Sequence, residues 1–492
     1  MTLGLLGAGL ARARSGSATG LAQSSTSAVR TKLDAIGRTV EAETRLRSAT
    51  GVSISVAVKG AIIWERGFGL AHRETATPAT AHTAFSLASI TKTFTTAAVM
   101  RLVESGKLDL DAPIERYLGS PLPRSRFAAQ SVTLRLLGGH AAGLPSLFEM
   151  FDPSRAPSMV DLIRDYGELA YPAGERYEYA NLGYSLLGAA ISRVTGQDFS
   201  ASLKDLVIRP MGLRNTFFDT DSARMRDAAG RYDPNDREIP FYATATPPSG
   251  ELYASAHDLS LFSANMMGIR PEGRTPLLRQ EALDTLLSPV FTSRTKAFTT
   301  FGWSGRDIAG ERIIVKTGGQ PGVAARLTLL PSRKVSIAVI ANRDDNRKLV
   351  ANISNDIASS LISDWGNPDF QMEEVLAPDA GTRDFDGAWT GSIRNGDKAE
   401  SLRLLINAAG ASCTVGNGSA QPIRDLDIHS RTFTFNVDGD LVPNAVNDGT
   451  PRQMNFKLVA RNDDLIGRCL SVIDRSGFAW TEPHIVTLSR SS

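Results

Sequence analysis

The sequence predicts an α+β protein. One antiparallel sheet flanked by helices, with a largely helical subdomain, is expected first, and a small all-β, barrel-like domain follows it. Two observations predict this order. Strand-like segments lie near both ends of residues 27–366, with helical segments between them. Beyond a proline-containing break, short segments of alternating polar and apolar residues take over, with turn pairs between or near them.

The first elements follow from local periodicity. Apolar residues recur at three- and four-residue spacing from 27 to 40, which predicts a helix with one buried face. Residues 52–58 alternate as a strand, Lys59-Gly60 forms a turn, and residues 61–64 resume the strand, so a hairpin is expected. The later segments of this part are helices at 90–103, 184–194 and 346–361, and strands at 312–315, 326–330 and 335–341.

The boundaries come from composition. Residues 1–26 are expected to be a disordered tail or targeting segment, and 27–366 a single domain. Residues 367–384, with their prolines, are expected to be a linker before the domain at 385–492. In that last domain, alternating apolar residues are expected to share one face: Leu402, Leu404, Ile406, Phe433, Phe435, Val437, Met454, Phe456 and Leu458.

Composition excludes several classes of function. The net charge of +2 gives no reason to expect nucleic acid or an anionic membrane as a partner. No apolar stretch is long enough to span a bilayer. No H-E-x-x-H motif or Cys/His cluster occurs, so neither a metal nor a cofactor is predicted. The two cysteines, Cys413 and Cys469, are expected either as buried thiols or as one disulfide of an exported protein.

The N-terminus leaves the compartment open. Residues 3–11 resemble the apolar core of a signal peptide, but Arg12 and Arg14 follow this core instead of preceding it. An export signal, an organellar transit peptide and a plain tail all remain as hypotheses. A periplasmic or secreted location is favoured, with cytoplasmic and organellar locations as alternatives.

The most informative stretch is Ser89-Ile90-Thr91-Lys92, at the start of an apolar helical run. Residues i and i+3 share a helix face, so Lys92 would lie within reach of the Ser89 hydroxyl. A serine hydroxyl needs a nearby base to become a nucleophile. A free lysine has a pKa of about 10.4, but burial and a second cation both favour its neutral form.

Two further patches follow in order, Tyr179-Ala180-Asn181 and Lys316-Thr317-Gly318-Gly319. With Ser89-x-x-Lys92 they resemble the motifs of the serine β-lactamase and penicillin-binding-protein superfamily. The resemblance is to its class C-like branch, which contains class C β-lactamases, DD-peptidases, D-aminopeptidases and family VIII carboxylesterases. It spans roughly residues 33–362 and implies a β-lactamase/transpeptidase-like fold. Residues from about 385 more weakly resemble the lipocalin-like domains appended to D-aminopeptidase-type members.

The resemblance implies a role for each matched residue. Ser89 is expected to be the nucleophile, Lys92 its base, and Tyr179 the group that relays a proton to the leaving group. The other matched side chains and glycine are expected to bind substrate or support catalysis: Asn181, Lys316, Thr317 and Gly318. Backbone N–H groups of Ser89 and Gly319 are expected to form the oxyanion hole.

Neighbouring residues receive structural roles. His140 is expected to be structural, and Asp258 to be a helix N-cap. The segments 119–130, 146–171 and 218–250 are expected to wall the site and set its specificity.

The expected activity is that of a serine hydrolase that forms an acyl-enzyme on amide bonds of peptides, D-aminoacyl compounds or β-lactams. A lysine at 316 favours substrates with a negative group near the scissile bond. A carboxylesterase of the same fold is the alternative, and a catalytically silent penicillin-binding sensor or scaffold is a second one. The expected partner is a small-molecule or short-peptide substrate, and a homo-oligomer is left open.

Overall fold

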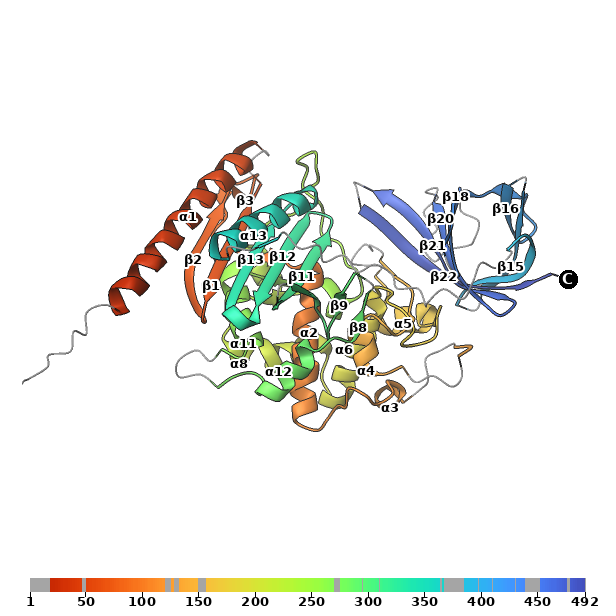
Figure 1. The fold of residues 1–492 in the computed structure, drawn as a ribbon, viewed down its shortest axis with the longest axis horizontal. Helices are drawn as coiled ribbons and strands as arrows, with labels where there is room; N and C mark the ends of the chain where they lie inside the picture. Colours follow the sequence, from red (N-terminus) through yellow and green to blue (C-terminus); the bar gives the residue numbers. More distant parts are fainter. Residues whose placement is uncertain are drawn as a thin grey trace, which may run out of the picture.

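The computed structural model describes most of the chain, and the statements below concern these residues: 18–46, 50–119, 125–127, 132–148, 156–269, 275–293, 295–308, 310–362, 365–366, 385–396, 398–408, 410–429, 431–438, 452–475 and 478–491. Figure 1 shows a unit of helices and strands followed by a β-rich unit at the C-terminus. The predicted linker at 367–384 and the first seventeen residues lie outside the described part. Among the described residues, no helix has the length and apolarity needed to cross a membrane.

The first unit is built on one antiparallel sheet. In the described chain it has eight strands in the order β2-β1-β13-β12-β11-β10-β9-β8. The strands are β1 (Val52–Val58), β2 (Ala61–Phe68), β8 (Phe291–Thr292), β9 (Ala297–Thr299), β10 (Ser304–Ile308), β11 (Glu311–Gln320), β12 (Val323–Leu330) and β13 (Val335–Ala341). The chain's first and last strands of this unit therefore pair with each other, as β1 with β13, next to the edge strand β2.

Helices cover both faces of this sheet (Figure 1). On one face lie α1 (Ala18–Leu46) and α13 (Arg347–Leu361), which pack on β2, β12 and β13. The remaining helices are α2 (Thr91–Glu104), α3 (Glu115–Leu118), α4 (Leu134–Gly138), α5 (Met159–Tyr166), α6 (Asn181–Thr195), α7 (Phe199–Leu203), α8 (Arg209–Met211), α9 (Ser222–Met225), α10 (Pro247–Gly250), α11 (Ala256–Met266) and α12 (Gln280–Leu287). Short elements complete the unit: β3 (Leu70–His72), β4 (Thr77–Pro78), β5 (Phe85–Ser86), β6 (Phe217–Phe218), β7 (Leu252–Ala254), η1 (Ala88–Ile90), η2 (Lys204–Ile208), η3 (Pro331–Arg333) and η4 (Asp344–Asn346).

The central strands are buried on both faces, which explains their nearly continuous apolar sequence. Successive side chains of a strand point to opposite faces. In β13, Ile337 and Val339 therefore join the core under α1 and α13, whereas Ala338 and Ile340 join the core shared with the helical subdomain. This arrangement confirms the predicted α+β class.

The C-terminal unit is a single antiparallel sheet. Within the described residues it has nine strands in the order β17-β16-β15-β14-β22-β21-β20-β19-β18. They are β14 (Gly387–Asn395), β15 (Lys398–Asn407), β16 (Gly410–Val415), β17 (Gln421–Pro422), β18 (Arg424–His429), β19 (Thr432–Asp438), β20 (Gln453–Arg461), β21 (Asp464–Arg475) and β22 (Phe478–Arg490). β17 packs against β19, so the sheet is nearly closed into a barrel. All the apolar residues predicted to share one face lie in its core, and Cys413 and Cys469 are buried, free thiols.

Several boundaries differ from the sequence predictions: β2 ends at Phe68 instead of 64, and β12 begins at Val323 instead of 326. The first helix begins at Ala18 instead of 27, because no proline or turn pair interrupts the stretch before it. The helix expected at 184 begins at Asn181, directly after Ala180 in an extended conformation. The strand expected at 312–315 continues through the Lys-Thr-Gly-Gly motif to Gln320, because residues 314–320 pair with β12.

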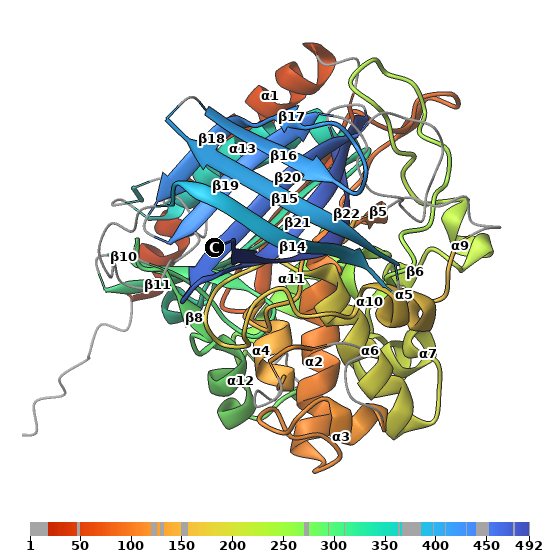
Figure 2. The same ribbon diagram turned by 90° about the vertical axis from the view of Figure 1, so that its right-hand side faces the viewer.

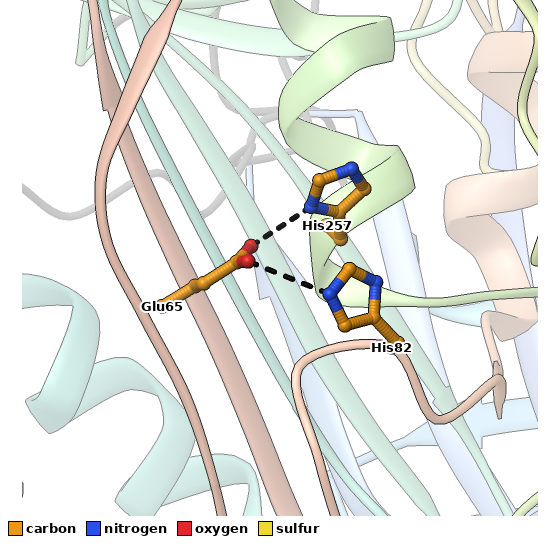
Figure 3. A group of neighbouring side chains, drawn as sticks. All are labelled: Glu65, His82 and His257. Atoms are coloured by element: carbon orange, nitrogen blue, oxygen red, sulfur yellow. Dashed lines mark hydrogen bonds and ion pairs between the residues drawn. The ribbon is translucent and has the colours of Figure 1, made fainter.

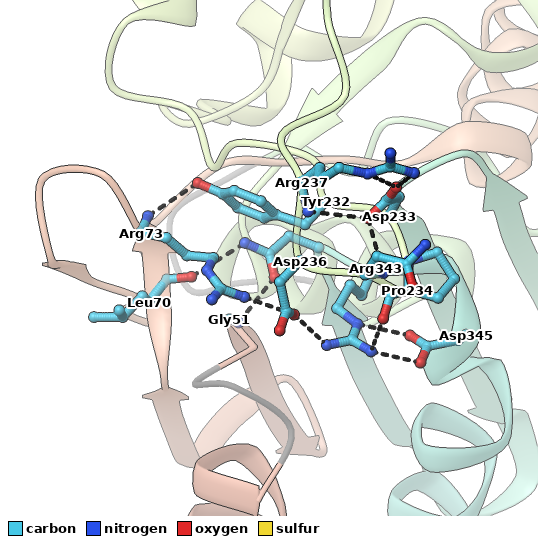
Figure 4. A network of polar contacts seen from close by, with 12 residues as sticks. Gly51, Leu70, Arg73, Tyr232, Asp233, Pro234, Asp236, Arg237, Arg343 and Asp345 are labelled. Carbon is cyan, nitrogen blue, oxygen red and sulfur yellow. Dashed lines mark hydrogen bonds and ion pairs between the residues drawn. The ribbon is translucent and has the colours of Figure 1, made fainter. Parts of the chain in front are cut away.

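A polar network anchors part of the predicted wall at 218–250 to the sheet (Figure 4). The Asp236 carboxylate lies 2.6 Å from the guanidinium groups of both Arg73 and Arg343. Arg343 also pairs with Asp345 at 2.8 Å, and the backbone N–H of Tyr232 donates to the carbonyl of Asn342. The segment that leads to α10 is thus held against the ends of β3 and β13, and α10 contributes directly to the site described next.

Candidate active site

Ser89 lies in η1, immediately before α2. Its neighbour Ala88 has a φ of 44°, a left-handed conformation that is unfavourable for a residue with a side chain. The Ser89 hydroxyl faces Tyr179, just before α6, and Lys92 of α2. Gly318 explains the close approach of β11, because a Cβ at that position would lie 2.1 Å from the carbonyl oxygen of Leu87. Any side chain at 318 would push the strand away from the candidate nucleophile.

Lys92, one turn after Ser89, is completely buried. Its Nζ lies 3.2 Å from Ser89 Oγ, 2.8 Å from Asn181 Oδ1 and 2.8 Å from the backbone carbonyl oxygen of Ser249. Asn181 Nδ2 donates to the carbonyl of Leu147 at 3.0 Å, which orients the amide so that its oxygen faces Lys92. Three separate elements, α2, α6 and α10, therefore meet at one amino group.

Burial lowers the pKa of Lys92 well below its usual value, and the nearby Lys316 lowers it further. This is the effect that the sequence predicted for a buried lysine beside a second cation. Lys316, on β11, is only 6% exposed, and burial lowers its own pKa to about 7.

Tyr179 is the second hydrogen-bond partner of the Ser89 hydroxyl, beside Lys92. Its hydroxyl lies 2.8 Å from Ser89 Oγ. Burial raises the pKa of Tyr179 to about 12, although the hydrogen bond with Ser89 opposes the rise, so the phenol carries its proton at neutral pH. Lys92 and Lys316 lie 5.1 Å and 5.8 Å from the centre of its ring.

The His140 ring packs against the ring of Tyr179. The two rings stack with centroids 4.2 Å apart, and His140 Nδ1 accepts a hydrogen bond from the Ala180 N–H at 3.2 Å. Burial and the two lysines lower the pKa of His140 well below its usual value, so it stays neutral. Its place is consistent with the structural role expected from the sequence.

The other matched residues lie along β11. Gly318 is buried against the turn before Ser89, Thr317 is exposed, and Gly319 is partly exposed. β11 packs against η1, so the backbone of Gly319 lies on the strand beside the candidate nucleophile. The oxyanion hole of Ser89 and Gly319 and the substrate contact of Thr317 stay predictions.

Some residues of the site carry no signal in the sequence. Ser249 takes part through its backbone carbonyl, which no side-chain motif can reveal. Asp258 was expected to be an N-cap, but Ser255 caps α11, and Asp258 accepts hydrogen bonds from the Asn215 N–H and the Thr216 hydroxyl.

The barrel reaches the residue next to Tyr179. Arg468 of β21 donates from Nε to Glu178 Oε1 at 3.0 Å, and the two side chains are only 9% and 4% exposed. Burial by itself would raise the pKa of Glu178, but Arg468, Lys457 and Arg176 together hold it below its usual value. On the same side, the Tyr171 hydroxyl donates to the Lys457 carbonyl at 3.0 Å. Figure 2 shows the barrel strands in front of the first unit.

Comparisons with known proteins assign the chain to a family. A family model described as Beta-lactamase matches residues 37–358, so the chain belongs to this family. A curated human relative, "Putative beta-lactamase-like 1", is 29% identical over an alignment of 338 residues, and the match covers 64% of this chain and 66% of that protein. The matched part thus covers slightly less than two thirds of that relative's length.

Solved structures share the fold. The structure of a protein called SurE matches 94% of this chain and all of its own, with a TM-score of 0.65 and 22% identity. An octameric penicillin-binding protein homologue from Pyrococcus abyssi matches 92% of this chain and 99% of its own, with a TM-score of 0.59 and 18% identity. A β-lactamase/D-alanine carboxypeptidase from Pseudomonas syringae matches 68% of this chain and 99% of its own, with a TM-score of 0.58 and 20% identity. These likenesses confirm the class C-like fold, and the first two also cover most of the chain beyond the family match.

The buried ion pair gives a first prediction. Replacing Arg468 by Met leaves the Glu178 carboxylate buried without its main partner, which should lower the free energy of unfolding by roughly 3–5 kcal/mol. Because Glu178 precedes Tyr179, the turnover of any substrate should also fall more than its binding. Chemical denaturation and steady-state kinetics measure the two effects.

Arg461→Met is the matched control, because Arg461 pairs with Glu175 at the same boundary but both side chains are 42% exposed. Its cost should be at most about 1 kcal/mol. Equal losses in the two variants would contradict the assigned role of the buried pair.

Proposed function

We propose that this protein is a serine hydrolase that forms an acyl-enzyme on Ser89 and cleaves amide bonds next to a negatively charged group. Peptides, D-aminoacyl compounds and β-lactams are the substrate classes with this chemistry. The contact set of Lys92 Nζ is the observation that carries the proposal.

The partners of Lys92 define which proton it can accept. Two of them, the Asn181 amide oxygen and the Ser249 carbonyl, can only accept hydrogen bonds. A neutral amine has two N–H donors and one lone pair, so donation to these two oxygens leaves the lone pair for the Ser89 hydroxyl. The lowered pKa of Lys92 favours this neutral form. The geometry therefore suits Lys92 as the general base.

In the proposed reaction, each proton that one group releases is taken up by another. Ser89 Oγ attacks the carbonyl carbon as its proton passes to Lys92, and the developing oxyanion is held by the backbone N–H groups of Ser89 and Gly319. When the C–N bond breaks, the leaving nitrogen takes a proton through the Tyr179 hydroxyl, which recovers it from Lys92. In the second half, water passes its proton through the Tyr179 hydroxyl to neutral Lys92 and attacks the ester carbonyl. When the C–O bond to Ser89 breaks, Ser89 Oγ takes that proton back from Lys92 and the acid is released.

Lys316 supports the preference for anionic substrates. It is a buried cation on the strand beside Ser89, and a substrate carboxylate would compensate the cost of burying its charge. The comparison with a protein called a β-lactamase/D-alanine carboxypeptidase supports the same class of chemistry. The octameric state named for the Pyrococcus abyssi homologue supports testing this chain for self-association.

Covalent labelling tests the nucleophile. Incubation with a fluorophosphonate or a penicillin should add one mass increment to the intact protein, and peptide mapping should place it on Ser89. Ser89→Ala should abolish labelling, and Lys92→Met should slow it by roughly 10²–10⁴-fold, the usual contribution of a general base. Ser105→Ala, at the far end of α2, serves as the control and should label normally.

Absence of any adduct on the wild-type protein would refute the proposed nucleophile. A stable penicillin adduct without turnover of any amide or ester would favour the silent penicillin-binding alternative.

The pH dependence tests the role of Lys316. Because its pKa is about 7, this side chain loses its charge as the pH rises through neutrality. For an amide substrate with a free carboxylate, kcat/KM should therefore fall about tenfold per pH unit above 7. A neutral nitrophenyl ester should show no such fall, because it does not need the Lys316 charge.

In the matched variant Lys316→Met, the charged amide should lose roughly 10–100-fold in kcat/KM relative to the ester, as expected for a hydrogen bond to a charged group. Its additional fall above pH 7 should also disappear. Identical profiles for both substrates in the wild-type protein, with faster ester turnover, would favour the carboxylesterase alternative.

A further inference from the structure

Two histidines and a glutamate from distant parts of the chain converge on one point of the surface (Figure 3). Glu65 lies on β2, His82 on the loop between β4 and β5, and His257 in the first turn of α11. One potential ligand atom from each residue lies within 4.8 Å of the others. We propose that Glu65, His82 and His257 form a site for a divalent transition metal, with Zn²⁺ as the expected occupant.

The spacing of the ligand atoms suits a tetrahedral ion. Zinc–ligand bonds of about 2.1 Å place neighbouring ligands roughly 3.4 Å apart. Glu65 Oε2 lies 3.0 Å from His257 Nδ1, and Glu65 Oε1 lies 3.6 Å from His82 Nε2. The two imidazole rings have centroids 4.5 Å apart and planes tilted by 41°. A small movement of the carboxylate away from both rings would admit an ion between the three groups.

The backbone holds the ligands in place. The His257 N–H donates to the Ala81 carbonyl at 3.1 Å, which ties the start of α11 to the loop that carries His82. In that loop, the Thr80 hydroxyl accepts from the N–H groups of His82 and Thr83 at 3.2 Å and 3.1 Å. A loop ordered in this way loses little entropy on binding an ion, so the metal affinity is preserved.

Charge and access are also suitable. The Glu65 carboxylate supplies one negative charge, and the Asp258 carboxylate interacts electrostatically with both histidines. The side chain of His82 is 56% exposed, whereas those of Glu65 and His257 are 26% and 29% exposed. An ion can therefore enter from solvent, and water can take the fourth position.

The position of the site suggests what the metal does. It links β2, the loop at 80–83 and α11, and the same loop leads through β5 into η1, where Ser89 lies. The α11 side is continuous with β7, which pairs with β5 at Phe85 and Ala254. A bound ion would thus stabilise the base of the segment that carries the candidate nucleophile, without taking part in acyl transfer.

Zinc binding to protein without a histidine tag tests the proposal. After chelator treatment and dialysis, the wild-type protein should bind one equivalent of Zn²⁺ with a dissociation constant in the micromolar range or below, measured by competition with a chromophoric chelator. Glu65→Gln, His82→Ala and His257→Ala should each weaken binding by at least tenfold. The control His72→Ala, on β3 outside the cluster, should bind as the wild type does.

Thermal unfolding supplies an independent readout. Zn²⁺ should raise the Tm of the wild type and of His72→Ala, as ligands of the native state do, but not that of the ligand variants. Without metal, all variants should unfold within a few degrees of the wild type, which shows that they fold. Wild-type protein that binds no Zn²⁺ up to about 100 μM, or a Glu65→Gln/His257→Ala double variant that keeps its stoichiometric zinc, would overturn the proposal.

Discussion

The site depends on the burial of one amino group. Lys92 is completely enclosed, and its partners come from three elements that are far apart in the sequence. A buried ammonium without a carboxylate partner is expensive, so the surroundings favour the neutral amine. The amide of Asn181 and the carbonyl of Ser249 satisfy its two N–H groups, and the remaining lone pair faces the serine. The cost of burying this lysine is therefore the source of its proposed reactivity.

The rest of the structure excludes water from that amino group and holds its neighbours in place. The polar network around Asp236 anchors the segment that ends at α10 and Ser249. Gly318 lets β11 approach the turn before Ser89, which brings the Lys316 charge close to Lys92. The barrel contacts the first unit through the buried pair of Arg468 and Glu178, one residue before Tyr179. Packing of the C-terminal unit is thus connected to the position of the proposed proton relay.

Much of this structure could be predicted from local sequence patterns. The features that these patterns missed depend on contacts between distant segments. The hairpin at 52–64, the strand at 335–341 and the barrel core around Phe435 followed from periodicity, because each depends on the alternation of nearby residues. The grouping of Ser89, Lys92, Tyr179 and Asn181 could be expected because three spaced motifs resemble one family. The Ser249 carbonyl could not be expected, because a backbone group has no residue signature. Glu65, His82 and His257 were also missed, since only the fold brings them together.

The protonation state of Lys92 is the central claim, and it can be observed directly. In protein with ¹³C at the lysine ε-carbons, the Lys92 resonance can be assigned by comparison with Lys92→Met and followed over a range of pH. Lys92 should titrate well below the value of about 10.4 of a free lysine, because burial and the nearby Lys316 lower its pKa. A Lys92 that titrates at or above 10.4 in the folded protein would be an ammonium at neutral pH, and it could not be the base proposed for Ser89.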